Sequence, residues 1–180
     1  MENQATSRQG DKPLLTGLFR DRESTEGAYQ SLRSRGYSDD EINVIMSDET
    51  RDKYYSDGDT ALDDNKALEG AGAGSAIGGT LGAIIGGIAA IGTSLVVPGL
   101  GLVVAGPIVA ALAGAGAGGI TGGLVGALIG WGIPEERAKM YETGVTEGGT
   151  VLGVNPRTPE DADYFENDWK TNYKGENIYR

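Results

Sequence analysis

The sequence contains neither cysteine nor histidine among its 180 residues. Without cysteine the chain cannot form a disulfide, a thiol nucleophile or a thiolate metal site. Without histidine it loses the commonest general base and the commonest transition-metal ligand. We therefore expect a protein that is not an enzyme and that holds no cofactor and no metal ion.

The chain also has little positive charge. It carries 15 Lys and Arg residues against 26 Asp and Glu residues, which gives a formal net charge of −11. Because nucleic-acid binding needs clustered Lys and Arg, no nucleic-acid partner is expected. Anionic lipid headgroups would repel such a chain, so any contact with a membrane must be hydrophobic. The first residues include no apolar run of signal-peptide length, which predicts a cytoplasmic N-terminus.

One long stretch has no charge at all. From Gly70 to Pro134 there are 65 residues without Asp, Glu, Lys or Arg, and most of the 31 glycines lie there. This stretch divides the chain into six predicted parts. They are a flexible N-terminus (1–13), the first half of an α/β domain (14–56), an acidic linker or helix start (57–69), a glycine-zipper helical hairpin (70–133), the second half of the domain (134–155), and a C-terminal aromatic helix with a tail (156–180).

The two polar flanks carry the signals of short strands and helices. Three apolar runs predict strands: LLTGLF (Leu14–Phe19), INVIM (Ile42–Met46) and TVLGV (Thr150–Val154). Helices are predicted after Asp21, a capping residue, after Pro134, which suits a first helical turn, and after Thr158. The expected fold class is α+β. It is a small three-stranded α/β sandwich (β-α-β … α-β), interrupted by a long glycine-zipper α-helical hairpin and followed by a C-terminal helix.

The same flanks resemble a known family. The segment LTGLFRDRESTEGAYQSLRSRGYSDDEINVIMSDE is similar to the opening of the bacterial general-stress (heat-induced stress) protein domain. There, a strand leads into an Ala-bearing helix, a Gly-aromatic-Ser-Asp turn and an Ile/Val strand. The segment GIPEERAKMYETGVTEGGTVLGV resembles the closing half of that family, which also has a Gly-rich apolar insert between its halves. The resemblance covers roughly residues 14–155 and implies an association with stress but no catalytic residue.

Glycine recurs at every fourth position in two parts of the uncharged stretch. The first series is Gly70, Gly74, Gly78, Gly82 and Gly86. The second series is Gly106, Ala110, Gly114, Gly118, Gly122, Gly126 and Gly130. Residues four apart share one ridge of a helix, so each series would form a groove along which a second backbone could pack. These glycines are the predicted helix-packing and oligomerisation residues.

Glycine in a helix has an energetic cost that other interactions must offset. Each interior glycine costs about 0.5–1 kcal/mol relative to alanine, so five or six per helix cost roughly 3–6 kcal/mol. Close helix packing in lipid, or burial against other copies in a soluble assembly, could offset that cost. At about 1.5 Å per residue, helices over Gly74–Val97 and Pro107–Ile133 would both be long enough to cross a hydrocarbon core of about 30 Å.

The predicted turn between these two helices is not polar. In SLVVPGLGLVVAGP the turn residues are Pro98, Gly99, Gly101 and Pro107. No charged residue marks a loop in water, so we expect the tip to stay buried in a bilayer or against neighbouring subunits. Both polar flanks would then lie on one side, where their halves can pair.

Other patterns favour structural roles. DGDTALDDN (57–65) resembles a calcium loop but lacks the ligands and the glycine that such a loop needs at its later positions. SDDE (38–41) is interpreted as a capping turn. Phe165, Trp169 and Tyr173 recur at helical spacing, which predicts a docking stripe for the sheet or for a neighbouring subunit.

Together these features predict a non-enzymatic, stress-associated protein that self-assembles through glycine-zipper hairpins at or in a membrane. Its partners would be copies of itself and membrane lipid, and its polar α/β domain would lie on the cytoplasmic side. The alternative is a soluble, cytoplasmic homo-oligomeric scaffold or shell, in which the hairpins form a common buried core. A third alternative is a ligand-sensing α/β module, for which the sequence offers no binding residues.

Overall fold

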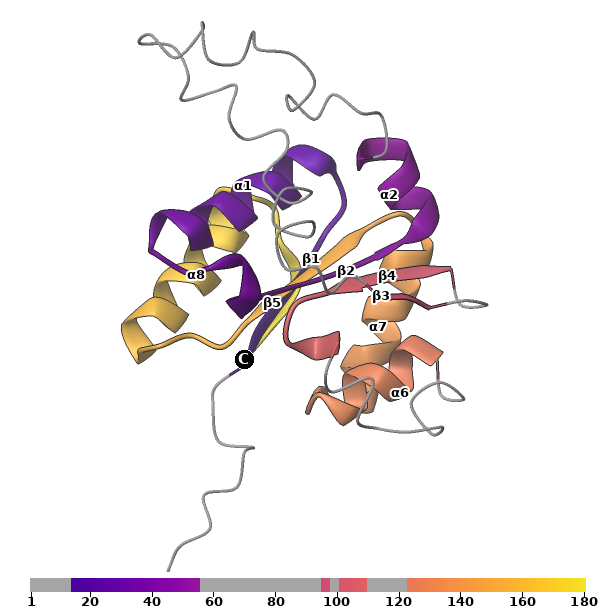
Figure 1. Cartoon of the computed structure of the whole chain (residues 1–180). Coiled ribbons are helices and arrows are strands. Elements are labelled where there is room, and N and C mark those ends of the chain that lie inside the picture. Colours follow the sequence, from indigo (N-terminus) through magenta and orange to yellow (C-terminus); the bar gives the residue numbers. More distant parts are fainter. Residues whose placement is uncertain (1–13, 56–94, 98–100, 110–122) are drawn as a thin grey trace, which may run out of the picture.

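The computed structural model describes residues 14–55, 95–97, 101–109 and 123–180 (Figure 1). Within these ranges one sheet has six strands in the order β3-β4-β2-β5-β1-β6. The strands are β1 (Leu15–Phe19), β2 (Ile42–Ser47), β3 (Leu95–Val97), β4 (Leu102–Ala105), β5 (Thr150–Val154) and β6 (Glu176–Tyr179). The helices are α1 (Arg22–Ser34), α2 (Asp48–Tyr55), α6 (Gly123–Gly130), α7 (Glu135–Thr146) and α8 (Pro159–Thr171), with a 3-10 turn, η1 (Asp39–Glu41).

The sheet joins the two polar flanks of the chain. Every neighbouring pair of strands is antiparallel. β5, which follows the uncharged stretch, lies between β1 and β2, which precede it, so Val154 is paired with Leu15 on one side and with Ile42 on the other. The mixed α+β class is thus confirmed. The predicted number of three strands is wrong, because β3, β4 and β6 extend the sheet beyond its three central strands.

The helix starts depend on local caps. The Asp21 carboxylate accepts a hydrogen bond of 2.8 Å from the Ser24 N–H at the start of α1, and the Thr158 hydroxyl accepts one of 3.1 Å from the Asp161 N–H at the start of α8. Such bonds satisfy N–H groups that have no partner within the helix. In the SDDE turn the Glu41 carboxylate accepts from the N–H of Ser38, at 2.9 Å.

Helices cover both faces of the sheet, α1 and α8 on one face and α6 and α7 on the other (Figure 1). Strand side chains alternate between the two faces. In β2, Val44 and Met46 lie in the core beneath α1 and α8, whereas Ile45 lies in the core beneath α6 and α7. Because both faces are covered, every residue of β1 and β5 is buried, as is every residue of β2 except Ser47 at its end.

The predicted helical hairpin is corrected where the structure describes it. Helix was expected through Val97 and again from Pro107, but Leu95–Val97 and Leu102–Ala105 are strands that pair with each other. Gly101, with φ +59°, lies in the turn between strands, not between helices. The physical reason is that the Val-rich runs suit a pleated sheet, and β2 offers a neighbouring edge with which β4 pairs.

Several predicted features lie outside the described residues. They are the N-terminus 1–13, the acidic linker 57–69, and the turn and packing residues Gly70, Gly74, Gly78, Gly82, Gly86, Pro98, Gly99, Gly114, Gly118 and Gly122.

Candidate functional site

The uncharged stretch contributes a strand pair and a helix to one side of the molecule. β4 pairs with β2 from Val44↔Ala105 to Ser47↔Leu102, and β3 pairs with β4. α6 lies against the same region, because its Leu124 and Leu128 share one buried cluster with Leu102 and Val104 of β4. The strand pair and α6 together form the candidate site, which we call the uncharged surface.

α6 is apolar on all sides. Its sequence, GLVGALIG, contains no polar side chain. Leu124, Ala127 and Leu128 are buried, but Ile129 is 44% exposed and Gly130 is exposed as well. A helix that is hydrophobic all round is normally buried on all sides. The exposed side of α6 is therefore suited to burial against another apolar surface.

The position of α6 is fixed at its C-terminal end. Gly132, with φ +98°, turns the chain toward α7. The ring of Trp131 lies against Gly153 of β5, where an added Cβ would be only 2.3 Å from the ring. Any side chain at position 153 would displace Trp131, so this glycine lets the α6–α7 connection pack onto the sheet.

A buried asparagine binds the backbone of the uncharged stretch just after β4. Asn43 of β2 accepts a hydrogen bond of 2.6 Å from the backbone N–H of Ile108. Its side-chain amide donates to the Gly153 carbonyl at 3.2 Å. The sequence analysis did not single out Asn43, although a polar residue inside the apolar run INVIM is a detectable signal, because a buried amide needs partners.

Three members of the predicted glycine series are described, and they have different environments. Gly106 is not helical: its φ is +94°, and a Cβ there would be 2.2 Å from the carbonyl oxygen of Ile42. Its expected place on a helical ridge is therefore corrected, because it permits close approach to the backbone of β2. Gly126 and Gly130 do lie in α6. A Cβ at Gly130 would meet no atom within 4 Å.

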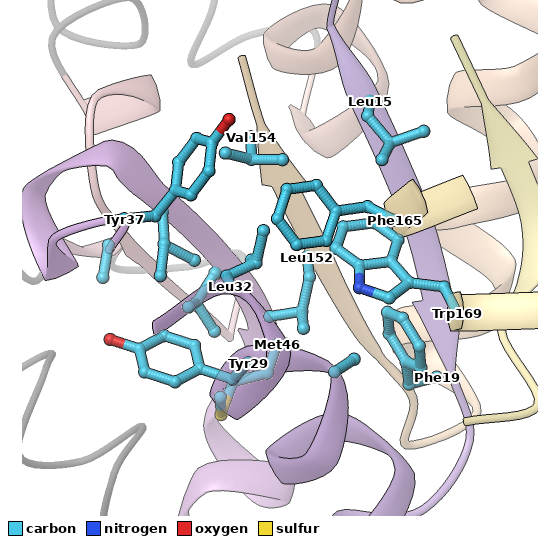
Figure 2. Packing of buried hydrophobic residues seen from close by; sticks show 14 of the residues in the cluster. Leu15, Phe19, Tyr29, Leu32, Tyr37, Met46, Leu152, Val154, Phe165 and Trp169 are labelled. Atoms are coloured by element: carbon cyan, nitrogen blue, oxygen red, sulfur yellow. The ribbon is translucent and has the colours of Figure 1, made fainter. Parts of the chain in front are cut away.

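In the aromatic stripe, Phe165 and Trp169 of α8 face the sheet and α1 (Figure 2). Phe165 and Trp169 are fully buried, and Tyr173 packs partly buried against the same cluster. The Trp169 ring meets the Phe19 ring edge-on at 5.4 Å between centroids. Its indole Nε1 is buried without a hydrogen-bond partner. The stripe is thus part of the core of a single copy.

A polar network joins the turn after α1 to the start of α8. The Tyr37 hydroxyl accepts from the backbone N–H of Arg157 at 2.7 Å and donates to Asp161 at 2.8 Å. The Arg157 guanidinium binds the Glu41 carboxylate at 2.6 Å, which lowers the pKa of Glu41 to about 2. These groups bind one another and connect two loops, so we assign the network a structural role.

A second acidic group has the opposite environment. Glu26 of α1 is buried, and this burial raises its pKa even though Arg22 binds it at 2.9 Å. The buried hydroxyl of Tyr55, at the end of α2, has no hydrogen-bond partner. In the part of the chain that the structure describes, no three acidic side chains come together as a possible metal site.

Comparisons with known proteins found no relative of this chain. The chain matches no protein-family model, and no curated protein or solved structure matches it significantly. The link to the general-stress domain therefore stays a prediction from the sequence. Among the described helices, none combines the length and the apolar character needed to cross a membrane.

Proposed function

We propose that this chain is a non-enzymatic protein that assembles with copies of itself through the uncharged surface. The observation that carries the proposal is α6, an apolar helix whose outer side, including Ile129, remains exposed. Each copy has a net charge of −11, so copies repel one another over most of their surface. Contact through a surface without charge has the least electrostatic cost. The association with stress is proposed from the sequence resemblance alone.

The way the fold uses the uncharged stretch favours contact between protein copies over a bilayer-crossing helical hairpin. Helix α6 takes up residues near the end of the predicted second arm, Pro107–Ile133, and its Leu124 and Leu128 pack against β4. Gly123, the first residue of α6, has φ +62°, which is outside the range of a right-handed helix, so α6 does not continue an earlier helix without a break.

The test is the mass of the purified full-length protein, measured by light scattering across a range of concentrations. Replacing Ile129 with Lys places a charge on the outer side of α6 and should reduce the assembled mass. Met140→Lys is the matched control, because Met140 is 48% exposed but lies on α7. Met140→Lys should leave the mass unchanged. An Ile129→Lys variant with the mass of the parent protein would exclude the proposed surface.

A flotation assay distinguishes the membrane alternative. The protein is mixed with vesicles of zwitterionic phosphatidylcholine, which avoids repulsion of an acidic chain. We expect it to stay with the unbound fraction. Flotation of the protein together with the vesicles, and a single-copy mass in their absence, would instead support membrane association.

A further inference from the structure

The two edges of the sheet are built differently. Edge strand β6 has a register irregularity opposite β1, and two non-glycine residues with positive φ, Lys174 and Asn177, lie in or beside it. Its Glu176 is paired with Arg20 at 3.0 Å. Irregular backbone and charged side chains are the usual means by which an edge strand is kept from pairing with another chain.

Edge strand β3 has no comparable protection by charge. Its three residues, Leu95–Val97, are apolar, and the nearest charged residues along the chain are Glu69 and Glu135. β3 pairs with β4 on one side, and none of the other described strands pairs with its outer side. An apolar edge without charge is a template for a further strand.

The hydrogen-bond pattern shows which backbone groups of β3 face outward. The Asp48 N–H donates to the Gly101 carbonyl at 2.8 Å, just beyond the pair Ser47↔Leu102. In an antiparallel ladder, bonded and non-bonded pairs alternate, so Leu102 and Val104 direct their backbone groups toward β3. Their partners Val97 and Leu95 then point toward β4. Val96 therefore directs its N–H and C=O to the open edge.

We infer that β3 of one copy pairs antiparallel with β3 of a second copy, with the two Val96 residues exchanging backbone hydrogen bonds across a twofold axis. This inference rests on the proposed self-assembly and names its contact. Identical strands suit a twofold contact, since each presents the same donor and acceptor to the other. A pair of three-residue strands is too small for a stable interface alone. The neighbouring α6 supplies the further apolar area, which keeps the contact within the uncharged surface.

The test replaces Val96 with Pro in the full-length chain. Proline lacks the outward N–H but leaves the bonds of Leu95 and Val97 to β4 in place. Loss of one ordinary hydrogen bond from each copy should raise the dissociation constant of the assembly about 30-fold. Val96→Thr keeps the N–H and the β-branched shape, so it is the matched control and should assemble like the parent protein.

Hydrogen exchange of the unsubstituted protein gives an independent measurement. The Val96 amide should exchange slowly at concentrations where the protein is assembled and quickly where it is a single copy. Equal protection at both concentrations would mean that another part of the same chain covers β3, which would overturn the inference. If Ile129→Lys reduces the mass but Val96→Pro does not, strand pairing is wrong and the proposed function stands. If neither variant changes the mass, both are wrong.

Discussion

Helices α1 and α8 are joined by polar side-chain bonds, whereas the side chains of α6 are all apolar. Between the first two helices, Ser31 donates to Asp168 at 2.5 Å, and Arg35 beside α1 pairs with Asp161 at 2.6 Å. α6 has no side chain that could form such a bond. The difference teaches that the outer sides of the two faces differ in chemistry: the helix on the second face leaves apolar Ile129 exposed, which the proposed self-assembly would cover.

Truncation of the aromatic core should have the largest effect. Phe165→Ala is expected to lower the free energy of unfolding by about 3–5 kcal/mol, because the ring is fully buried and leaves a cavity. Urea unfolding should give the same loss at every protein concentration, since this face lies within one copy. If copies assemble as proposed, Leu128→Ala should instead show a loss that grows with concentration, because removing this buried side chain also shifts α6 in the proposed contact. Equal concentration dependence would remove the contrast between the two faces.

Two glycines of the same predicted series should respond in opposite directions. Gly106→Ala should cost about 3 kcal/mol, because alanine is strained at a positive φ and its Cβ would press on the Ile42 carbonyl. Gly130→Ala, at an open position in α6, should stabilise the helix by up to about 1 kcal/mol. Thermal or urea unfolding measures both changes. If both substitutions lowered the free energy of unfolding by similar amounts, the result would support the prediction that both glycines lie on one helical ridge.

A smaller effect is expected for Trp169→Phe. The substitution loses part of the ring but also removes the buried indole N–H that has no partner. Because the two contributions oppose each other, the free energy of unfolding should stay within about 1 kcal/mol of the parent value. A loss of about 3 kcal/mol or more would be close to the cost of removing the whole side chain. Such a loss would show that the indole N–H has a hydrogen-bond partner after all.

The smallest expected effect is a pH dependence from the polar network. The pKa of Glu41 is about 2 in the folded protein, below the ordinary 4.5, because Arg157 binds the charged form. Its contribution to stability is therefore complete above pH 4.5 and is lost as the pH falls through 2. Both side chains are partly exposed, 37% and 48%, so we expect less than about 1 kcal/mol.

The measurement compares urea unfolding of the parent protein and of Glu41→Gln between neutral and low pH. The difference in the free energy of unfolding between the parent protein and Glu41→Gln should shrink as Glu41 becomes protonated. The contribution of Glu26 to stability should change with pH in the opposite direction, because burial raises the pKa of this carboxyl group. Its unfavourable charge is removed as the pH falls through that raised pKa, so this contribution to stability increases on acidification. A constant difference for Glu41→Gln would contradict the proposed role of its charge.

The parts of the fold that the sequence predicts are those set by neighbouring residues. Asp21 and Thr158 cap helices from one turn away, and Gly36, with φ +83°, follows the end of α1. The three central strands correspond to short apolar runs with turn residues at their ends. Each of these signals lies within a few residues of the element that it specifies, so no knowledge of the tertiary fold is needed.

The parts that the sequence does not predict depend on distant partners. The four-residue spacing of the glycines predicts that the helix extends to Leu95–Val97. These residues form a strand instead, because they pair with β4, which in turn pairs with β2. β6 and α2 are mostly polar and contain no apolar run that would predict them. In the candidate site, the apolar character of α6 could be predicted from its composition, but the exposure of Ile129 could not. The outward direction of Val96 follows only from the register of two other strand pairs.

The position of β5 between β1 and β2 has a consequence for synthesis on the ribosome. The first two strands are made about 100 residues before the strand that separates them, a delay of roughly 5–20 s at ordinary rates of translation. During that interval the centre of the sheet is missing, while the chain without charge emerges between the two halves. If copies assemble as proposed, neighbouring chains on one messenger RNA would meet at this stage, before any single chain is complete.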